Sequence, residues 1–206
     1  MIRNFLFSLF FFTGIVFISL IFLPAILLPK KLVLFGGKIM GYWTSFCLQI
    51  FLSTKIIIKG KENIIENKKF FIAASHQSMF ETFFLQTIFN SPVFILKREL
   101  LMIPIFGWYL KKIGSISIKR NKVSKENLGF FDDISEQINS SDRPLIIFPQ
   151  GTRLPPKDRT PFKKGSKKIN TILTISILKA IEPGLEKNIF LKSLESAIYS
   201  ELDILG

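Results

Sequence analysis

The sequence contains very little cysteine and histidine. Cys47 is the single cysteine and His76 the single histidine among 206 residues. One cysteine cannot form an internal disulfide, and it excludes a C-x-x-C type of metal site. Cys47 lies in the apolar run WTSFCLQIF, where a cysteine usually packs as a small hydrophobic side chain. We therefore expect no metal ion and no cofactor, and any chemistry that needs an imidazole depends on His76.

Acidic residues are also scarce. There are 15 Asp and Glu against 28 Lys and Arg, which gives a formal net charge of +13. This excess indicates an anionic partner, such as nucleic acid, an anionic lipid surface or a phosphorylated substrate. No nucleic-acid-binding module accompanies the charge, so we expect no nucleic acid as partner. Within residues 153–168 seven basic side chains stand against one acidic side chain, and we expect this stretch to face anionic headgroups of membrane lipids.

Charge is entirely missing from residues 5–29, a stretch of 25 residues. As one helix it would be roughly 37 Å long, enough to cross a hydrocarbon core of about 30 Å. A secretory signal peptide has a shorter apolar region and a small-residue cleavage site, and neither feature is present. Pro24 would break a helical hydrogen bond, which leaves a kinked or re-entrant segment as an alternative to a straight span.

Basic residues flank this segment mainly on its C-terminal side. Lys30, Lys31 and Lys38 follow it, and the positive-inside tendency then puts the rest of the chain in the cytoplasm. Residues 32–54 are rich in aromatics and predict a second helix. Two interpretations of that helix stay open: it lies at the membrane interface, or it covers the core of the following domain. We assign residues 1–54 as membrane-anchoring helices.

From residue 55 onward, short apolar runs alternate with helical patterns. The sequence predicts strands at 55–60, 68–75, 91–97, 115–120, 143–149 and 170–179, and helices at 79–89, 104–114, 124–140 and 186–202. The strand at 68–75 is expected to be buried on both faces. This alternation is typical of an α/β fold with a mostly parallel central sheet flanked by helices. Ligands gather at the carboxyl ends of such strands, which is where His76 lies.

His76 has a carboxylate close behind it in SHQSMFET, residues 75–82. One interpretation is a general base whose tautomer Glu81 fixes by accepting a hydrogen bond from the second ring nitrogen. The other is a capping box, because S-x-x-E is the pattern in which Ser78 caps the helix and Glu81 answers from the third position. Spacing alone does not decide between them.

Three ordered blocks carry a resemblance to a known family. SHQSMFET follows one apolar strand, IGSISIKR comes next, and IFPQGTR follows another apolar strand. In this order and at these separations they resemble the glycerolipid acyltransferase family, with the bacterial 1-acylglycerol-3-phosphate acyltransferases as the best fit. The resemblance covers roughly residues 30–206. It implies an enzyme of the bacterial inner membrane, with its catalytic domain on the cytoplasmic face.

The resemblance also implies a reaction. A fatty acyl group would move from acyl-CoA or acyl-carrier protein to the free glycerol hydroxyl of lysophosphatidic acid, giving phosphatidic acid. His76 would be the base, and Glu81 would take the place of the aspartate usual in the family. No G-x-S-x-G elbow is present, so nothing points to a serine nucleophile.

The same resemblance implies a site for the acceptor's phosphate. The residues that match the family's positions are Arg120, Gly151, Thr152 and Arg153, with Lys97 as a weaker candidate. A guanidinium fork suits a phosphate well, and backbone N–H groups at a glycine can approach an anion. The alternatives are that Arg120 ends a strand in solvent and that PQGT is only a turn.

The chain departs from the family pattern at several points. Glu81 replaces Asp, Gln150 replaces the glutamate of F-P-E-G-T-R, and Ser117 replaces an aromatic residue. After Gly165 a helix and a strand that the family carries are predicted to be missing from the domain at 55–206. Two further readings therefore stay open: a non-catalytic, membrane-anchored lipid-binding homologue, and an acyltransferase that acts on another lysolipid.

Overall fold

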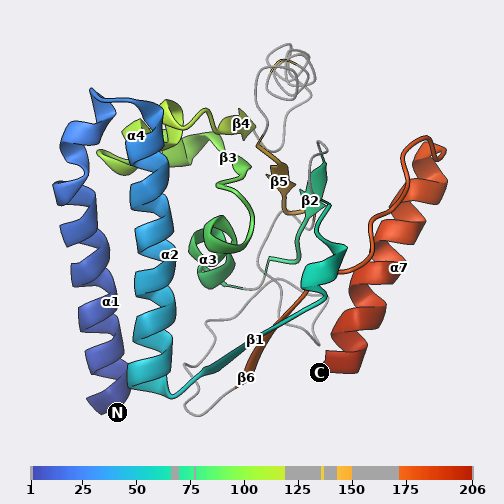
Figure 1. Ribbon diagram of the computed structural model, residues 1–206, viewed down its shortest axis with the longest axis horizontal. Coiled ribbons are helices and arrows are strands. Elements are labelled where there is room, and N and C mark those ends of the chain that lie inside the picture. Colours follow the sequence, from blue (N-terminus) through green and yellow to red (C-terminus); the bar gives the residue numbers. More distant parts are fainter. Residues whose placement is uncertain are drawn as a thin grey trace.

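The protein is an α/β structure in which parallel strands are covered by helices (Figure 1). The computed structural model describes residues 2–65, 70–76, 78–118, 136, 143–149 and 172–205. Within this part the strands form two sheets. One has four strands in the order β2 (Phe71–Ala73), β5 (Leu145–Ile147), β3 (Val93–Lys97), β4 (Ile116–Ile118), and the other pairs β1 (Lys55–Lys59) with β6 (Ile172–Ser176).

Every strand pair described is parallel. The predicted fold class, a mostly parallel sheet flanked by helices, is therefore confirmed, although the strands divide into two sheets. The helices predicted at 79–89, 104–114 and 186–202 are present as α3 (Phe80–Ile88), α4 (Phe106–Lys112) and α7 (Lys187–Leu205). Of the helix predicted at 124–140, all but residue 136 lie outside the described residues.

The N-terminal segment folds as a helical hairpin. α1 (Ile2–Ile21) is followed by a 3₁₀ turn, η1 (Leu23–Ile26), and then by α2 (Lys30–Leu52). The single helix expected over residues 5–29 is wrong in length, because α1 ends three residues before Pro24. Proline has no N–H and its ring would clash with the carbonyl one turn earlier. α1, with a mean hydropathy of 2.2, is the one helix in the described part that is long and apolar enough to cross a membrane.

The hairpin lies along the α/β part instead of projecting from it. At its open end Arg3 Nε donates a hydrogen bond to the carbonyl of Phe51, 2.8 Å away. Near its turn the hydroxyl of Tyr109 in α4 donates to the carbonyl of Ser19 in α1. Ala25 of η1 is buried in the same core cluster as Tyr109. Residues 5–29 are thus not one straight helix, because the chain turns back at η1 and the hairpin packs against the α/β part.

α2 lies between α1 and α3, and glycines allow the close approach. A Cβ at Gly41 would be only 2.6 Å from the carbonyl oxygen of Phe83 in α3. Cys47, on the same helix, is fully buried in a cluster with Phe7 and Phe11 of α1, as expected for a structural thiol. The interpretation of α2 as a cover for the core is thus borne out by its packing. α2 also keeps Phe35, Tyr42 and three other large hydrophobic side chains exposed.

The exposure of β2 differs from the prediction. β2 is not buried on both faces, since Phe71 is 54% exposed; β2 is an edge strand of its sheet.

The start of β3 is held by Arg143, which comes just before β5. Its guanidinium donates to the carbonyls of Ser91, Pro92 and Ile113, at 2.6, 3.1 and 2.6 Å. Burial lowers the pKa of Arg143 to about 10, so the side chain stays charged at neutral pH.

Candidate active site

His76 lies just beyond the carboxyl end of β2. The amide of Ala74 donates to the carbonyl of Ile147 at the end of β5, 2.9 Å away, which continues the pairing of the two strands. Phe148 directly follows β5, and its ring packs against the imidazole with ring centroids 4.3 Å apart and an angle of 32° between the ring planes. The predicted position of His76, at the carboxyl edge of a parallel sheet, is thus the observed one.

Glu81 lies in the first turn of α3 and faces the histidine. Its Oε1 is 3.3 Å from Nδ1 of His76, and the two side chains are only 13% and 15% exposed. Partial burial strengthens the interaction between the two groups, because little water screens them. The geometry therefore brings the imidazole and the carboxylate together, as the catalytic interpretation requires.

The reciprocal half of the predicted capping box, from Glu81 back to Ser78, is present as well, while the Ser78 hydroxyl bonds to Phe80 in place of the N–H of Glu81. The backbone N–H of Ser78 donates to Oε1 of Glu81 and the Ser78 hydroxyl donates to Oε2, both at 2.6 Å. The Ser78 hydroxyl in turn accepts from the N–H of Phe80, 3.0 Å away. The two interpretations of SHQSMFET are therefore not exclusive. One carboxylate closes the start of α3 and contacts the imidazole, so the cap fixes the position of the acid.

The charge on Glu81 follows from its partners. Burial by itself would raise the pKa of Glu81, but the contact with His76 and the hydrogen bonds from Ser78 outweigh it and hold this pKa below its ordinary value. The carboxylate is thus ionised at neutral pH. An ionised acceptor next to Nδ1 favours the tautomer with the proton on Nδ1, which leaves the lone pair on Nε2. Such an imidazole can take a proton from a hydroxyl.

The residues expected to bind phosphate are only partly within the described structure. Lys97 is at the carboxyl end of β3, in the same sheet as β2, so it shares an edge with His76. Its ammonium lies 3.2 Å from Oε1 of Glu99, and both side chains are about half exposed. Arg120, Gly151, Thr152 and Arg153 lie outside the described residues. In the chain they follow β4 and β5, whose carboxyl ends are at this same edge.

Phe148 is the residue of this site that sequence reasoning missed. The sequence predicts Phe148 only as part of the apolar strand at 143–149, whereas its ring packs against the imidazole. Its position directly after a strand at the carboxyl edge was the available signal.

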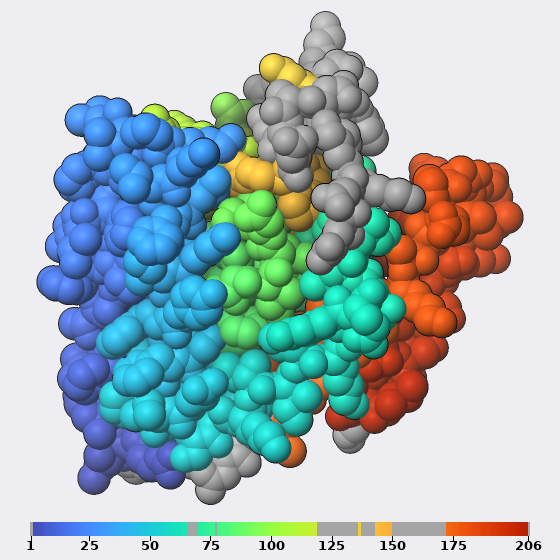
Figure 2. Space-filling model, viewed as in Figure 1, coloured from blue at the N-terminus to red at the C-terminus, as the bar shows by residue number. Residues whose placement is uncertain are grey.

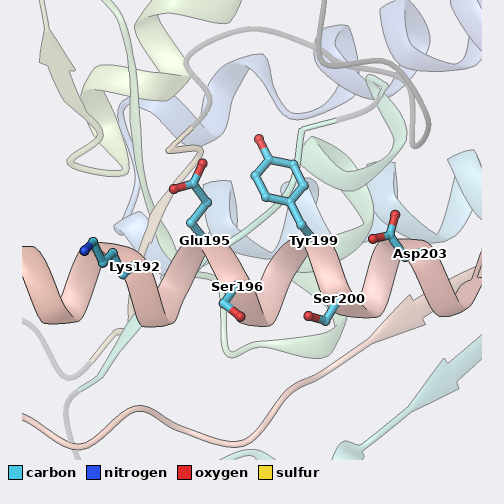
Figure 3. Close-up of a pocket in the computed structure, with 6 residues that line it drawn as sticks. All are labelled: Lys192, Glu195, Ser196, Tyr199, Ser200 and Asp203. Carbon is cyan, nitrogen blue, oxygen red and sulfur yellow. The ribbon is translucent and has the colours of Figure 1, made fainter.

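A separate hollow runs along α7, on the opposite flank of the molecule from α1 (Figures 1 and 3). It measures about 390 Å³, and its described lining is entirely from that helix, with Glu195 and Tyr199 pointing to the same side in Figure 3. None of its described lining residues is a predicted site residue. In the described part of the chain, no group of three or more His, Cys, Asp or Glu could hold a metal ion.

The chain is similar to known proteins in both sequence and fold. The chain is 34% identical over 126 residues to a 1-acyl-sn-glycerol-3-phosphate acyltransferase of Pseudomonas aeruginosa, which covers 60% of this chain and 48% of that protein. It is 29% identical over 141 residues to a protein of the same name from Saccharomyces cerevisiae, covering 65% and 46%. The chain thus spans about half the length of the curated relatives it matches.

A solved structure has the same fold. The crystal structure of the 1-acyl-sn-glycerophosphate (LPA) acyltransferase PlsC from Thermotoga maritima matches with a TM-score of 0.71 and 21% identity, over 99% of this chain and 96% of that one. The family model described as Acyltransferase matches residues 55–178. This match takes in β1 through β6 and His76 with Glu81, and it covers more than half of the 206 residues. The chain belongs to the acyltransferase family.

Proposed function

We propose that the protein transfers a fatty acyl group from acyl-CoA or acyl-carrier protein to the free glycerol hydroxyl of lysophosphatidic acid, which gives phosphatidic acid. The observation that carries the proposal is the contact between Nδ1 of His76 and Oε1 of Glu81, 3.3 Å apart at the carboxyl edge of the sheet. The names of the curated relatives support the choice of substrate class.

In the proposed reaction Nε2 of His76 takes the proton of the glycerol hydroxyl. The oxygen attacks the thioester carbonyl and forms a tetrahedral intermediate, which collapses with cleavage of the carbon–sulfur bond. The thiolate leaves, and the proton on Nε2 neutralises it. Glu81 remains ionised throughout and stabilises the transient imidazolium. No covalent acyl-enzyme is needed.

The acceptor's phosphate is the second part of the proposal. Arg120, Gly151, Thr152 and Arg153 follow β4 and β5 in the chain, and Lys97 ends β3 at the same sheet edge. Guanidinium groups suit bidentate phosphate binding. A phosphate held there would place the glycerol hydroxyl next to the imidazole, which is how a binding site contributes to rate.

Membrane attachment completes the proposal. Residues 1–54 would anchor the protein, and residues 55–206, shortened after Gly165, would form the catalytic domain. The exposed apolar side chains of α1, among them Phe5 and Phe17 at 67% and 65% exposure, support insertion into lipid. We propose that this membrane is the bacterial inner membrane with the catalytic domain on its cytoplasmic face, because the lysines that follow residue 29 favour that side.

Two assays test the function. A bacterial strain that lacks its own lysophosphatidic acid acyltransferase should grow with the wild-type gene and not with His76→Ala, and the purified variant should transfer acyl groups about 100-fold more slowly or worse. Equal rates would refute the mechanism. A wild-type protein that binds lysophosphatidic acid without transfer would instead be a non-catalytic lipid-binding homologue. Transfer to a different lysolipid would mean that the protein is an acyltransferase with another acceptor.

The phosphate site has its own test. Arg153→Ala should raise the concentration of lysophosphatidic acid needed for half-maximal rate, and leave that of the acyl donor nearly unchanged. Monoacylglycerol, which has no phosphate, is the control acceptor and should respond little to the substitution. A similar loss with both acceptors would mean that Arg153 has a structural role.

A further inference from the structure

A cluster of apolar side chains is exposed where β3 leads into α4. It comprises Leu100, Met102, Ile103 and Trp108, from η3 (Arg98–Met102), the loop after it and α4; we call it the η3–α4 surface. Met102 is 79% exposed and Trp108 51% exposed. The proposed chemistry uses none of these side chains. Exposed apolar side chains gathered in this way mark contact with another apolar body.

The η3–α4 surface adjoins the turn of the N-terminal hairpin. Tyr109 and Leu110 of α4 are buried in one core cluster with Ala25 of η1, so the inner sides of α4 and η1 pack together. On their outer sides the hairpin turn exposes Leu27 and Leu28, at 90% and 47%. Figure 1 shows α4 beside this turn. The surface therefore extends the apolar exterior of α1 and η1 beyond the hairpin.

The charges around these apolar side chains are almost all positive. Residues 27–31 and 97–112 carry six basic side chains and one acidic one, Glu99. The acidic side chain is already paired with Lys97 at 3.2 Å. Apolar side chains including a tryptophan, with lysines around them, are the composition of segments that lie in the interface of an anionic bilayer. Each cation near such a surface adds about 1 kcal/mol of attraction.

We propose that the η3–α4 surface enters the interface of an anionic phospholipid bilayer, as a second attachment beside the hairpin. The proposal rests on the membrane attachment proposed above. An acidic protein could also bind the basic residues. A bilayer is favoured because the surface is continuous with α1, whose mean hydropathy is 2.2 and whose outer side is apolar along its length.

The attachment has a consequence for the site. η3 begins directly after Lys97, at the carboxyl end of β3, and His76 is at the same edge of the sheet. Two attachments fix the tilt of a body on a surface, whereas a hairpin alone leaves rotation about its axis. The η3–α4 surface would thus hold the carboxyl edge near the depth at which the glycerol of a lysolipid lies.

The chain offers a direct test because it has only two tryptophans, Trp43 and Trp108. Trp43→Phe leaves Trp108 as reporter of the η3–α4 surface. Trp108→Phe leaves Trp43, which stacks on Phe46 in α2, as reporter of the hairpin. Each full-length variant is reconstituted into vesicles of phosphatidylglycerol and phosphatidylethanolamine with brominated acyl chains. We expect the bromine to lower the emission of Trp108 by about half, as for an interfacial tryptophan.

A matched pair of substitutions tests the surface itself. Met102→Asp should reduce the quenching of Trp108 about twofold or more, because a charged side chain avoids the apolar region. Ile204→Asp alters a side chain of α7 that is 75% exposed, on the flank opposite α1, and should leave the quenching unchanged. If Trp43→Phe disturbs folding, slower amide exchange over residues 98–110 of the unaltered protein on vesicles gives the same information.

The outcomes separate this inference from the proposed function. Quenching of Trp43 without quenching of Trp108 would overturn the second attachment and leave the hairpin as the anchor. Quenching of neither would overturn both attachments. Acyl transfer in detergent micelles does not depend on either result, so it continues to report on His76 alone. Protection of residues 98–110 by acyl-carrier protein, and not by vesicles, would mean that the surface binds protein.

Discussion

The shared carboxylate of Glu81 allows its two roles to be separated by a pair of variants. Glu81 accepts two bonds of 2.6 Å from Ser78 and contacts Nδ1 of His76 at 3.3 Å. Glu81→Gln keeps one acceptor oxygen and removes the charge. A hydrogen bond to a charged group contributes about 1.5–3 kcal/mol and a neutral one about 0.5–1.5, so we expect the free energy of unfolding to fall by about 1–2 kcal/mol.

Ser78→Ala is the matched control. It removes the hydroxyl that bonds Oε2 of Glu81 and accepts from Phe80, but it keeps the backbone N–H of residue 78 and the contact with the imidazole. The loss of such a cap costs about 1 kcal/mol, similar to the cost of Glu81→Gln. The two variants thus match in stability and differ in whether a charge faces His76.

The turnover number, kcat, then distinguishes the orienting role of Glu81 from its capping role. If Glu81 orients the base, Glu81→Gln should lower kcat about 100-fold or more and Ser78→Ala only a few-fold. The assay measures kcat at saturating substrates and the melting temperature on the same preparations in detergent micelles. Equal falls in kcat for the two variants would refute the orienting role and leave Glu81 as a cap.

The pH dependence of stability gives a second readout on Glu81. Because its folded-state pKa is below the ordinary value of 4.5, the ionised carboxylate stabilises the fold above that pH. The contribution is lost as the pH falls through the lower, folded-state pKa. Glu81→Gln should lack this acid-range loss. A variant that loses stability in acid just as the wild type does would contradict the assignment.

Three further changes test the supports of the site and the fold. Phe148→Leu removes the ring on the imidazole and should lower kcat up to about tenfold with little change in KM, since aromatic pairs contribute about 0.5–1.5 kcal/mol, while Phe148→Tyr should restore the rate. Gly41→Ala should lower the melting temperature, because its Cβ would be 2.6 Å from a backbone oxygen; Gly37→Ala, which meets only the flexible end of a glutamine, should be neutral or stabilising. Arg143→Met should lower the free energy of unfolding by about 3 kcal/mol or more in denaturant titration, because three carbonyls lose a charged donor; a smaller effect would mean that water replaces it.

Local patterns predicted the elements well and their assembly poorly. The period-2 and continuous apolar runs located every described strand, and Pro24 marked a break that the structure places three residues earlier. The order β2-β5-β3-β4 was not predictable, because it depends on which apolar faces fit together and no local signal encodes it. The separation of β1 and β6 into their own sheet is a result of the same kind.

In the site, too, the local elements were predictable from the sequence and the contacts between distant segments were not. Strand-then-helix order put His76 at the carboxyl edge, and the S-x-x-E spacing brought Glu81 within reach of it. The contact with Phe148 joins two segments 72 positions apart in the chain, so it could be found only once β2 and β5 were known to be neighbours. The spacing in SHQSMFET does not show whether Glu81 caps the helix or contacts His76, and the structure shows both, because one carboxylate has two oxygens for two partners.

The pairing of β1 with β6 affects how the protein can be made. Lys55 pairs with Ile172, so in the described part of the chain the first strand finds its partner only in the last one. As the chain leaves the ribosome, the hairpin can close once Ser53 has emerged, but β1 must wait until residues 172–176 have been made. During that time its isoleucines and open edge are available to other chains. A polypeptide whose synthesis stalls before residue 172 would thus keep β1 unpaired, and an unpaired strand is a target for chaperones and proteases.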